Sequence, residues 1–222
     1  MGDAIGETLG YAVGIAISPI PIAAVILMLF SGRARSNSVA FLVAWLAGIA
    51  LVTTIVVAVP GLETTDAEPS ATTGWIKHAL GALLLRAGAR QWRARPGPHD
   101  EAPVPGWMAR IDDLRPLAAA GLGFLLSALN PKNLLLAAAA GATMGALDLS
   151  TGDTAVTVAV FTVIAALTVA VPVIAYLVAG HRLDDTLEAT KAWLIDNNTA
   201  VMAVLFVVFG VNLLGDAIQI LT

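Results

Sequence analysis

Residues 125–136 read LLSALNPKNLLL, an apolar run that is interrupted at its centre by Asn130, Pro131, Lys132 and Asn133. Proline lacks a backbone N–H, and its ring clashes with the carbonyl one turn earlier, so it breaks or kinks a helix. A second element of this kind, SPIP at residues 18–21, interrupts the first apolar run of the chain. These two interruptions predict two broken helices.

The composition places these helices in a membrane. Of 222 residues, 58% are hydrophobic and only 13% are charged, and the mean hydropathy is +0.83. A soluble domain has about 25% charged residues, because its surface faces water. The chain is therefore expected to be an all-α polytopic membrane protein.

Several classes of protein are excluded by the same counts. The net charge is −4 with no basic tract, so nucleic acid is not an expected partner. The absence of cysteine removes disulfides and thiolate metal sites, and neither a metal nor a cofactor is expected. Residues 1–8 carry acidic side chains and no Lys or Arg, which argues against a signal peptide. There is no HExxH or GxSxG motif and no carboxylate pair at membrane depth, so an enzyme is not expected.

Six segments are long and apolar enough to be considered as membrane spans, since a helix needs about 20 residues to cross the bilayer core. The third is the weakest, because Lys77, His78, Arg86 and Arg90 interrupt it. The expected spans are residues 9–30, 39–59, 74–92, 117–145, 155–179 and 199–220.

The loop charges support six spans. One side of the membrane would carry only acidic residues: Asp3, Glu7, Glu63, Asp66, Glu68, Asp148, Asp153 and Asp216. The other side would carry the basic ones: Arg33, Arg35, Arg93, Arg95, Arg110, Arg115, Arg182 and Lys191. Because basic loops stay in the cytoplasm, this pattern predicts an inner (plasma) membrane protein with both termini outside the cytoplasm.

An internal repeat relates the two halves. Pro131 follows Pro19 by 112 residues, and Val-Ala-Val-Pro ending at Pro172 follows the same tetrapeptide ending at Pro60 by the same interval. A three-span unit enters the membrane from the opposite side in its second copy, which is the inverted repeat of many secondary transporters. The predicted division is a first repeat at 1–92, a Pro/Arg-rich cytoplasmic linker at 93–116 and a second repeat at 117–222.

Lys132 is the strongest pointer to a site. A lysine at the centre of a membrane helix costs about 2.5–3.5 kcal/mol, and such residues usually face a bundle interior on a transport path. No carboxylate lies at comparable depth in any span. Beside the free N–H groups of a new helix, its ammonium would form an anion site. The expected substrate-binding residues are Ser18, Pro19, Pro21, Asn130, Pro131, Lys132 and Asn133, with Lys77 and His78 as pathway candidates.

Other readings stay open. The prolines could mark simple kinks that Ser18 or Asn130 satisfies. Glycines recur every fourth residue at 2, 6, 10 and 14 and again at 141 and 145, which predicts close helix packing within the chain or, alternatively, a homodimer seam. Residues 181–198 suggest a short amphipathic helix on the inner face.

The motif Asn130-Pro131-Lys132 resembles the NPK motif of the LysE/RhtB exporter superfamily. The SPIP element at 18–21, the SGRAR sequence at 31–35 and the NPKNL sequence at 130–134 are more closely similar to the GAP branch, named for mycobacterial peptidoglycolipid- and sulfolipid-addressing proteins. The resemblance implies an actinobacterial inner-membrane protein that helps to export an envelope lipid or another small molecule. Amino-acid exporters usually have Gly-Pro where this chain has Ser18-Pro19.

Together, these features predict a secondary exporter with alternating access, whose substrate is an envelope lipid or a small anionic or zwitterionic solute. A scaffold for envelope-lipid biosynthesis and export, or an amino-acid exporter, is the alternative.

Overall fold

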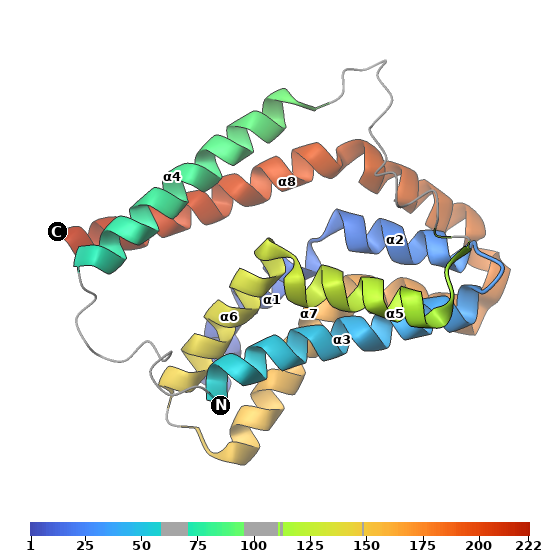
Figure 1. The fold of residues 1–222 in the computed structure, drawn as a ribbon, viewed down its shortest axis with the longest axis horizontal. Coiled ribbons are helices and arrows are strands. Elements are labelled where there is room, and N and C mark those ends of the chain that lie inside the picture. Colours follow the sequence, from blue (N-terminus) through green and yellow to red (C-terminus); the bar gives the residue numbers. More distant parts are fainter. Residues whose placement is uncertain (59–70, 96–110, 112, 148) are drawn as a thin grey trace. The chain divides into compact units, whose positions relative to one another are not determined.

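The structure is a computed structural model that describes residues 1–58, 71–95, 111, 113–147 and 149–222 (Figure 1). Within these residues the chain is helical and contains no strand, which confirms the predicted all-α class. The 93–116 linker and Pro60 fall largely or wholly outside the described residues. The helices are α1 (Gly2–Ala16), α2 (Pro19–Leu29), α3 (Ala34–Ala58), α4 (Ala71–Arg93), α5 (Pro116–Phe124), η2 (Leu125–Leu129), α6 (Pro131–Ala146), α7 (Thr151–Ala179), η3 (Gly180–Leu183) and α8 (Asp184–Leu221).

Three helices are long and apolar enough to cross a membrane by themselves: α3, α7 and α8. Two more spans result if each bent helix pair counts as one, which makes five. The third predicted segment corresponds to α4, which is not among these candidates. The structure thus supports a membrane-spanning protein, and the sixth crossing stays a prediction.

Both predicted breaks are present. α1 and α2 meet at a bend of 56°, and the α5–η2 segment meets α6 at a bend of 60°. Each proline occupies the first position of the helix that follows the break, Pro19 in α2 and Pro131 in α6. Proline is favoured there because its missing N–H has no partner in the first turn of a helix in any case.

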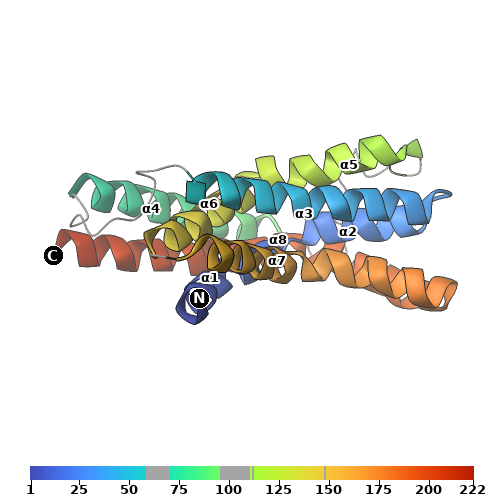
Figure 2. The same ribbon diagram turned by 90° about the horizontal axis from the view of Figure 1, so that it is seen from below.

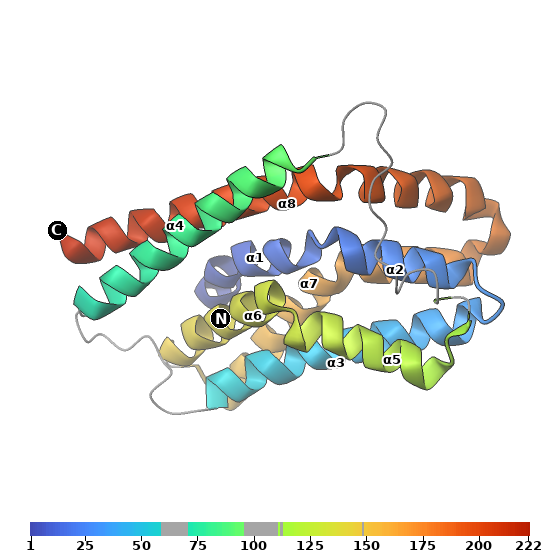
Figure 3. The ribbon, with the colours of Figure 1, turned by 45° about the horizontal axis from the view of Figure 1, so that its top comes forward.

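The chain divides into two compact units, and the first contains Met1–Thr65 and Val104–Ala192. In this unit α3 packs against α5 and α6, α7 packs against α1 and α2, and α1 also contacts α6 (Figure 3). The two continuous helices, α3 and α7, therefore each pack along the broken helix of the other sequence half.

Glycines allow the close approach of these helices. A Cβ built at Gly123 would lie 2.5 Å from the Phe41 carbonyl oxygen, and one at Gly141 would lie 2.8 Å from the Thr53 carbonyl oxygen. Gly141 thus serves packing within the chain. Cβ atoms built at residues 2, 6 and 10 would meet no described atom within 4 Å.

Part of the core of the first unit lies along one face of α3. Phe41 and Trp45 are fully buried there, with ring centroids 6.1 Å apart in a stacked arrangement. Asn37, Ile49 and Thr53 continue the same buried face at helical spacing. This packing fixes α3 against the second broken helix.

The second unit contains Asp66–Pro103 and Trp193–Thr222. Here α4 runs antiparallel to the C-terminal part of α8, and the two helices lie side by side in both views (Figures 1 and 2). A Cβ at Gly81 would lie 2.9 Å from the Gly210 carbonyl oxygen, and one at Gly88 would lie 3.1 Å from that of Ala203.

These units follow contacts in space, whereas the predicted repeats follow the sequence, so the repeat boundaries stay a prediction. The amphipathic segment expected at 181–198 does not form a separate helix. Its residues belong to η3 and to the start of α8, which continues without interruption to Leu221.

Candidate functional site

The site is built around the C-terminal end of α1. The last carbonyls of a helix have no partners within that helix, and in an apolar environment each unpaired one is costly. Lys132, at the start of α6, reaches this end: its Nζ donates to the carbonyl oxygens of Gly14 at 2.7 Å and Ile17 at 2.9 Å.

Two hydroxyl groups complete the same set. The Ser18 hydroxyl donates to the Ile15 carbonyl oxygen at 2.6 Å. The Thr168 hydroxyl, on α7, donates to the Ala16 carbonyl oxygen at 2.6 Å. Four consecutive carbonyls, from residue 14 to residue 17, are therefore satisfied by side chains from three separate parts of the first unit.

The ammonium group of Lys132 is fully used. It donates a third hydrogen bond, to Ser18 Oγ at 2.8 Å, and a lysine has three donors. Among the described residues, no carboxylate forms an ion pair with Lys132. Its charge lies at the C-terminal end of α1, where the helix dipole is negative, so carbonyl dipoles stabilise it.

Asparagines organise the second break. Asn130 is the N-cap of α6, and its Oδ1 accepts from the backbone N–H of Lys132 at 3.0 Å. Asn133 is fully buried, and its Nδ2 donates to the Leu126 carbonyl oxygen at 2.9 Å. The Ser18 hydroxyl lies 3.4 Å from Asn133 Oδ1, which links the two breaks directly.

The segment before this break is a π-helix, Leu125–Leu129. In a π-helix the hydrogen bonds run to the fifth residue, and such segments are rare and frequently lie at functional sites. The carbonyl of Leu126 lies in this segment and accepts a hydrogen bond from the side chain of Asn133. The irregular backbone is thus supported by a buried amide side chain.

Four of the predicted substrate-binding residues come together here: Ser18, Asn130, Lys132 and Asn133. Pro19 and Pro21 are buried in the first turn of α2, and Pro131 is exposed, so the prolines shape the backbone. In the structure the Lys132 ammonium points in a different direction from the one expected from the sequence. It points to the C-terminus of α1 rather than into a space beside the N-terminus of α6, because the freed carbonyls of α1 are the nearest acceptors.

The two pathway candidates belong to the second unit. His78 is exposed on α4, with its ring edge-on to Trp75 at 5.9 Å between centroids. The side chain of Lys77 lies outside the described residues. Where the structure describes the chain, no group of three His, Cys, Asp or Glu side chains is arranged to hold a metal ion.

Sequence reasoning did not find Thr168. Threonine in a helix usually bonds to a carbonyl of its own preceding turn, as Thr53 and Thr157 do. Thr168 bonds instead to a residue 152 positions earlier in the sequence. Nothing local distinguishes it, so only the packing of α7 on α1 reveals its role.

A groove lies between α3 and α7 in the same unit. Its volume is about 700 Å³, and its lining is mainly apolar with threonines at intervals. One of them, Thr162, is 6% exposed, and its hydroxyl has no hydrogen-bond partner among the described residues. The groove therefore combines apolar walls with one unused polar group.

The fold and the site define a helical membrane protein in which two broken helices are joined through a lysine. The chain belongs to the family described as Sap, sulfolipid-1-addressing protein, whose model matches residues 8–219. This confirms the resemblance to the sulfolipid-addressing branch. Neither a curated protein nor a solved structure matches the chain. The family links the chain to sulfolipid addressing as a membrane protein.

Proposed function

We propose that the chain is a non-enzymatic secondary transporter of the inner (plasma) membrane. It exports an envelope lipid or a small anionic or zwitterionic solute by alternating access. Its six spans form two inverted three-helix repeats, with both termini outside the cytoplasm. The observation that carries this proposal is the bridge from Lys132 Nζ, at one helix break, to the carbonyls of Gly14 and Ile17 at the other.

Reciprocal packing supports the inverted repeat. α3, from the first sequence half, packs on α5 and α6, while α7, from the second half, packs on α1 and α2. Exchanging the two halves leaves this part of the packing unchanged, as a pseudo-two-fold axis requires, whereas the α1–α6 and α2–α3 contacts are not matched in this way. The similar bends of 56° and 60° at the first span of each half agree with it.

The bonding of Lys132 suggests a mechanism. Carbonyl oxygens hold its ammonium in place, and an anionic group is a stronger acceptor than a neutral carbonyl. A substrate anion that arrives between the breaks takes Lys132 from Gly14 and Ile17. The end of α1 then loses two hydrogen bonds and changes its angle to α2. This change opens the site to the opposite side of the membrane. Release of the anion restores the starting bonds.

The α3–α7 groove supports a substrate with an apolar part. At about 700 Å³ it has the volume of ordinary ligand sites. Apolar walls favour a hydrocarbon chain, and the unused hydroxyl of Thr162 favours a polar group along it. A lipid fits this lining better than an amino acid, which carries an ammonium and a carboxylate group on one carbon.

Flux through the purified protein in liposomes tests the proposal. The candidate substrates are envelope-lipid extract and a set of amino acids. Lys132→Ala should abolish export even when the variant is present in the membrane at the normal amount. The substitution removes the only cation that the described residues place between the two breaks. Lys191→Ala is the matched control, since Lys191 lies over the Phe30 ring on the same unit and takes no part in the bridge. Unchanged transport by Lys132→Ala would remove this site from consideration.

A second candidate function is a scaffold that recruits envelope-lipid synthases and moves nothing itself. The observation that favours it is the complete use of the three Lys132 donors by the protein, which leaves none for a ligand. In that case Lys132→Ala would lower the thermal stability, and the wild-type protein alone would show no flux of any candidate substrate.

A homodimer formed through the open face at residues 2, 6 and 10 would suit either function.

A further inference from the structure

A second groove lies in the other unit, between α4 and α8. Its volume is about 460 Å³, and its walls are residues of α4 from Leu85 to Arg93 and of α8 from Ala203 to Val208. Gly88 forms its floor, because a Cβ there would lie 3.1 Å from both the Ala203 carbonyl oxygen and Val207 Cγ2. The missing side chain keeps the groove open between the two backbones.

Most of this groove is apolar and exposed. Val204, Val207 and Val208 expose 55%, 43% and 55% of their surface. Valines that face outward from a membrane helix meet hydrocarbon chains, so an acyl chain can lie along them without desolvating any polar group. The walls from Leu85 to Trp92 cover about 10 Å at the helical rise, and one leaflet of the hydrocarbon core is about 15 Å thick.

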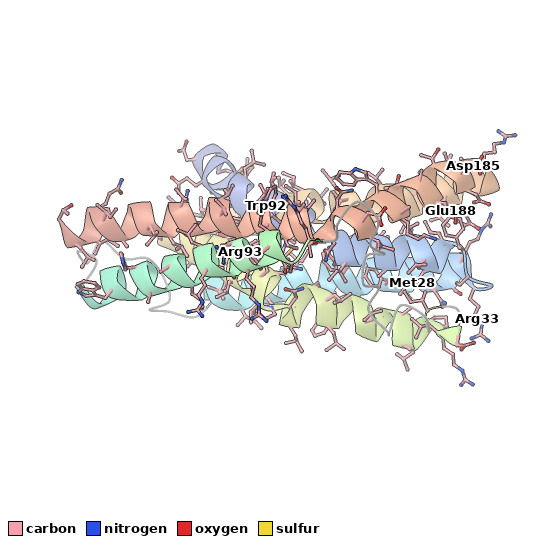
Figure 4. All side chains as sticks on the ribbon, turned by 90° about the horizontal axis from the view of Figure 1, so that it is seen from above. Met28, Arg33, Trp92, Arg93, Asp185 and Glu188 are labelled. Carbon is pink, nitrogen blue, oxygen red and sulfur yellow. The ribbon has the colours of Figure 1, made fainter. Side chains whose placement is uncertain are left out.

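One end of the groove is basic and aromatic. Arg93 lines it, and neighbouring Trp92 is 48% exposed (Figure 4). The guanidinium of Arg95 lies 4.1 Å from the ring centroid of Trp92, so a second positive charge is held at the same place. The described residues give Arg93 no carboxylate partner.

With α4 as the proposed sixth span, the helix register puts this end of the groove at the level of the membrane surface. Gly81 faces Gly210 and Gly88 faces Ala203, so the two helices are antiparallel with a constant offset. Continuing that offset brings Arg93 level with Asn198, where the polar residues of α8 give way to its apolar part. Tryptophan and arginine are typical of this level of a membrane protein.

We propose that the α4–α8 groove binds an anionic phospholipid of the surrounding membrane. The phosphate lies at Arg93 beside Trp92, and one acyl chain follows the glycine floor between Ala89 and Val204. Basic pockets between membrane helices bind anionic headgroups in this way. The site uses none of the residues Ser18, Asn130, Lys132 and Asn133, so it is independent of the site proposed for the transported substrate.

The test uses the full-length protein in phosphatidylcholine nanodiscs that contain spin-labelled phosphatidylglycerol, and it reads the immobilised lipid fraction. Arg93→Gln should lower the preference for phosphatidylglycerol over phosphatidylcholine by about fivefold. Arg93→Lys should keep part of the preference for phosphatidylglycerol. Arg33→Gln, an exposed arginine of the other unit, is the control and should leave the preference unchanged.

A filling variant tests the apolar part separately. Val204→Trp should reduce the immobilised fraction of both lipids, because the ring occupies the path of the acyl chain. Equal losses in Arg93→Gln and Arg33→Gln would mean general surface charge and would overturn the proposal, as would an unchanged preference in Arg93→Gln. Efficient disulfide formation by Val204→Cys would mean that a second copy covers the groove, which also overturns it. The circular dichroism of each variant must match that of the wild type.

Discussion

At Lys132 the choice of side chain follows from the shape of its acceptors. A lysine ammonium is compact, with three donors that diverge from one nitrogen. Gly14 O, Ile17 O and Ser18 Oγ lie 2.7, 2.9 and 2.8 Å from that nitrogen. A planar guanidinium presents its donors as a fork and cannot meet three acceptors grouped around one point. The charge therefore acts as a cap for α1, and under the proposed function it is also the group that an anion would bind.

Thr168 offers a test of this cap that leaves the charge in place. Thr168→Val keeps the shape and removes the hydroxyl, so the Ala16 carbonyl keeps only the backbone N–H of Ser18 as a donor, and the free energy of unfolding falls by about 1 kcal/mol. Thr168→Ser keeps the donor and should be close to the wild type. Thermal unfolding in detergent measures both.

The control for this pair is Thr190→Val, because the Thr190 hydroxyl bonds within its own helix, to the Thr186 carbonyl oxygen, and is exposed. It should change the midpoint much less than Thr168→Val. Equal stability of Thr168→Val and Thr168→Ser would show that the bond to Ala16 contributes nothing.

Among the helices, the broken pairs depend on both proline and packing. Pro19 and Pro131 begin their helices directly after the N-cap residues Ser18 and Asn130. The break at Pro131 follows a π-helix, in which the Leu126 carbonyl accepts from the Asn133 side chain. Proline alone explains where each helix restarts, and tertiary partners explain why the bend is tolerated.

The contact between α3 and α5 gives a matched pair of glycine variants. Gly123→Ala places a Cβ 2.5 Å from the Phe41 carbonyl oxygen, and backbone cannot yield as a side chain can. Overpacking of this kind costs about 1–3 kcal/mol. Gly121→Ala, two residues away on the same helix, meets nothing within 4 Å and should be neutral or slightly stabilising.

The measurement is the thermal midpoint of each purified variant in the same detergent. A drop for Gly123→Ala with no drop for Gly121→Ala is expected. Similar midpoints for the two variants would contradict the close contact of α3 with α5.

On the scale of the molecule, the number of crossings sets the sides of the two termini. With the five spans that length and composition allow, the C-terminus would lie opposite the N-terminus. With α4 as a sixth span, both lie on the same side. Because the chain has no cysteine, single cysteines report topology without background.

We expect Asp3→Cys and Thr222→Cys to react with a membrane-impermeant maleimide in intact cells, and Arg115→Cys to react only after lysis. This follows from the acidic and basic sides of the loop pattern. Labelling of Asp3→Cys without Thr222→Cys would mean that α4 does not cross. Labelling of Arg115→Cys in intact cells would contradict the proposed orientation.

The amino-acid sequence by itself determined the class of the protein, the helical segments and the positions of both breaks. Hydropathy and proline act locally: an apolar stretch of sufficient length enters the membrane, and a proline removes a hydrogen bond wherever it stands. For the same reason, the sequence placed Ser18, Asn130, Lys132 and Asn133 at the breaks. The resemblance to the family came from the same short motifs, and the family model confirms it over residues 8–219.

Only the tertiary structure decided what these residues contact. The direction of the Lys132 ammonium depends on the end of α1, which lies more than 110 residues earlier, and the role of Thr168 depends on α7 packing against α1. The close contacts of Gly123 and Gly88 and the two grooves likewise arise between distant segments. Such partners are chosen by shape and unsatisfied hydrogen bonds across helices, and no local pattern of residues records them.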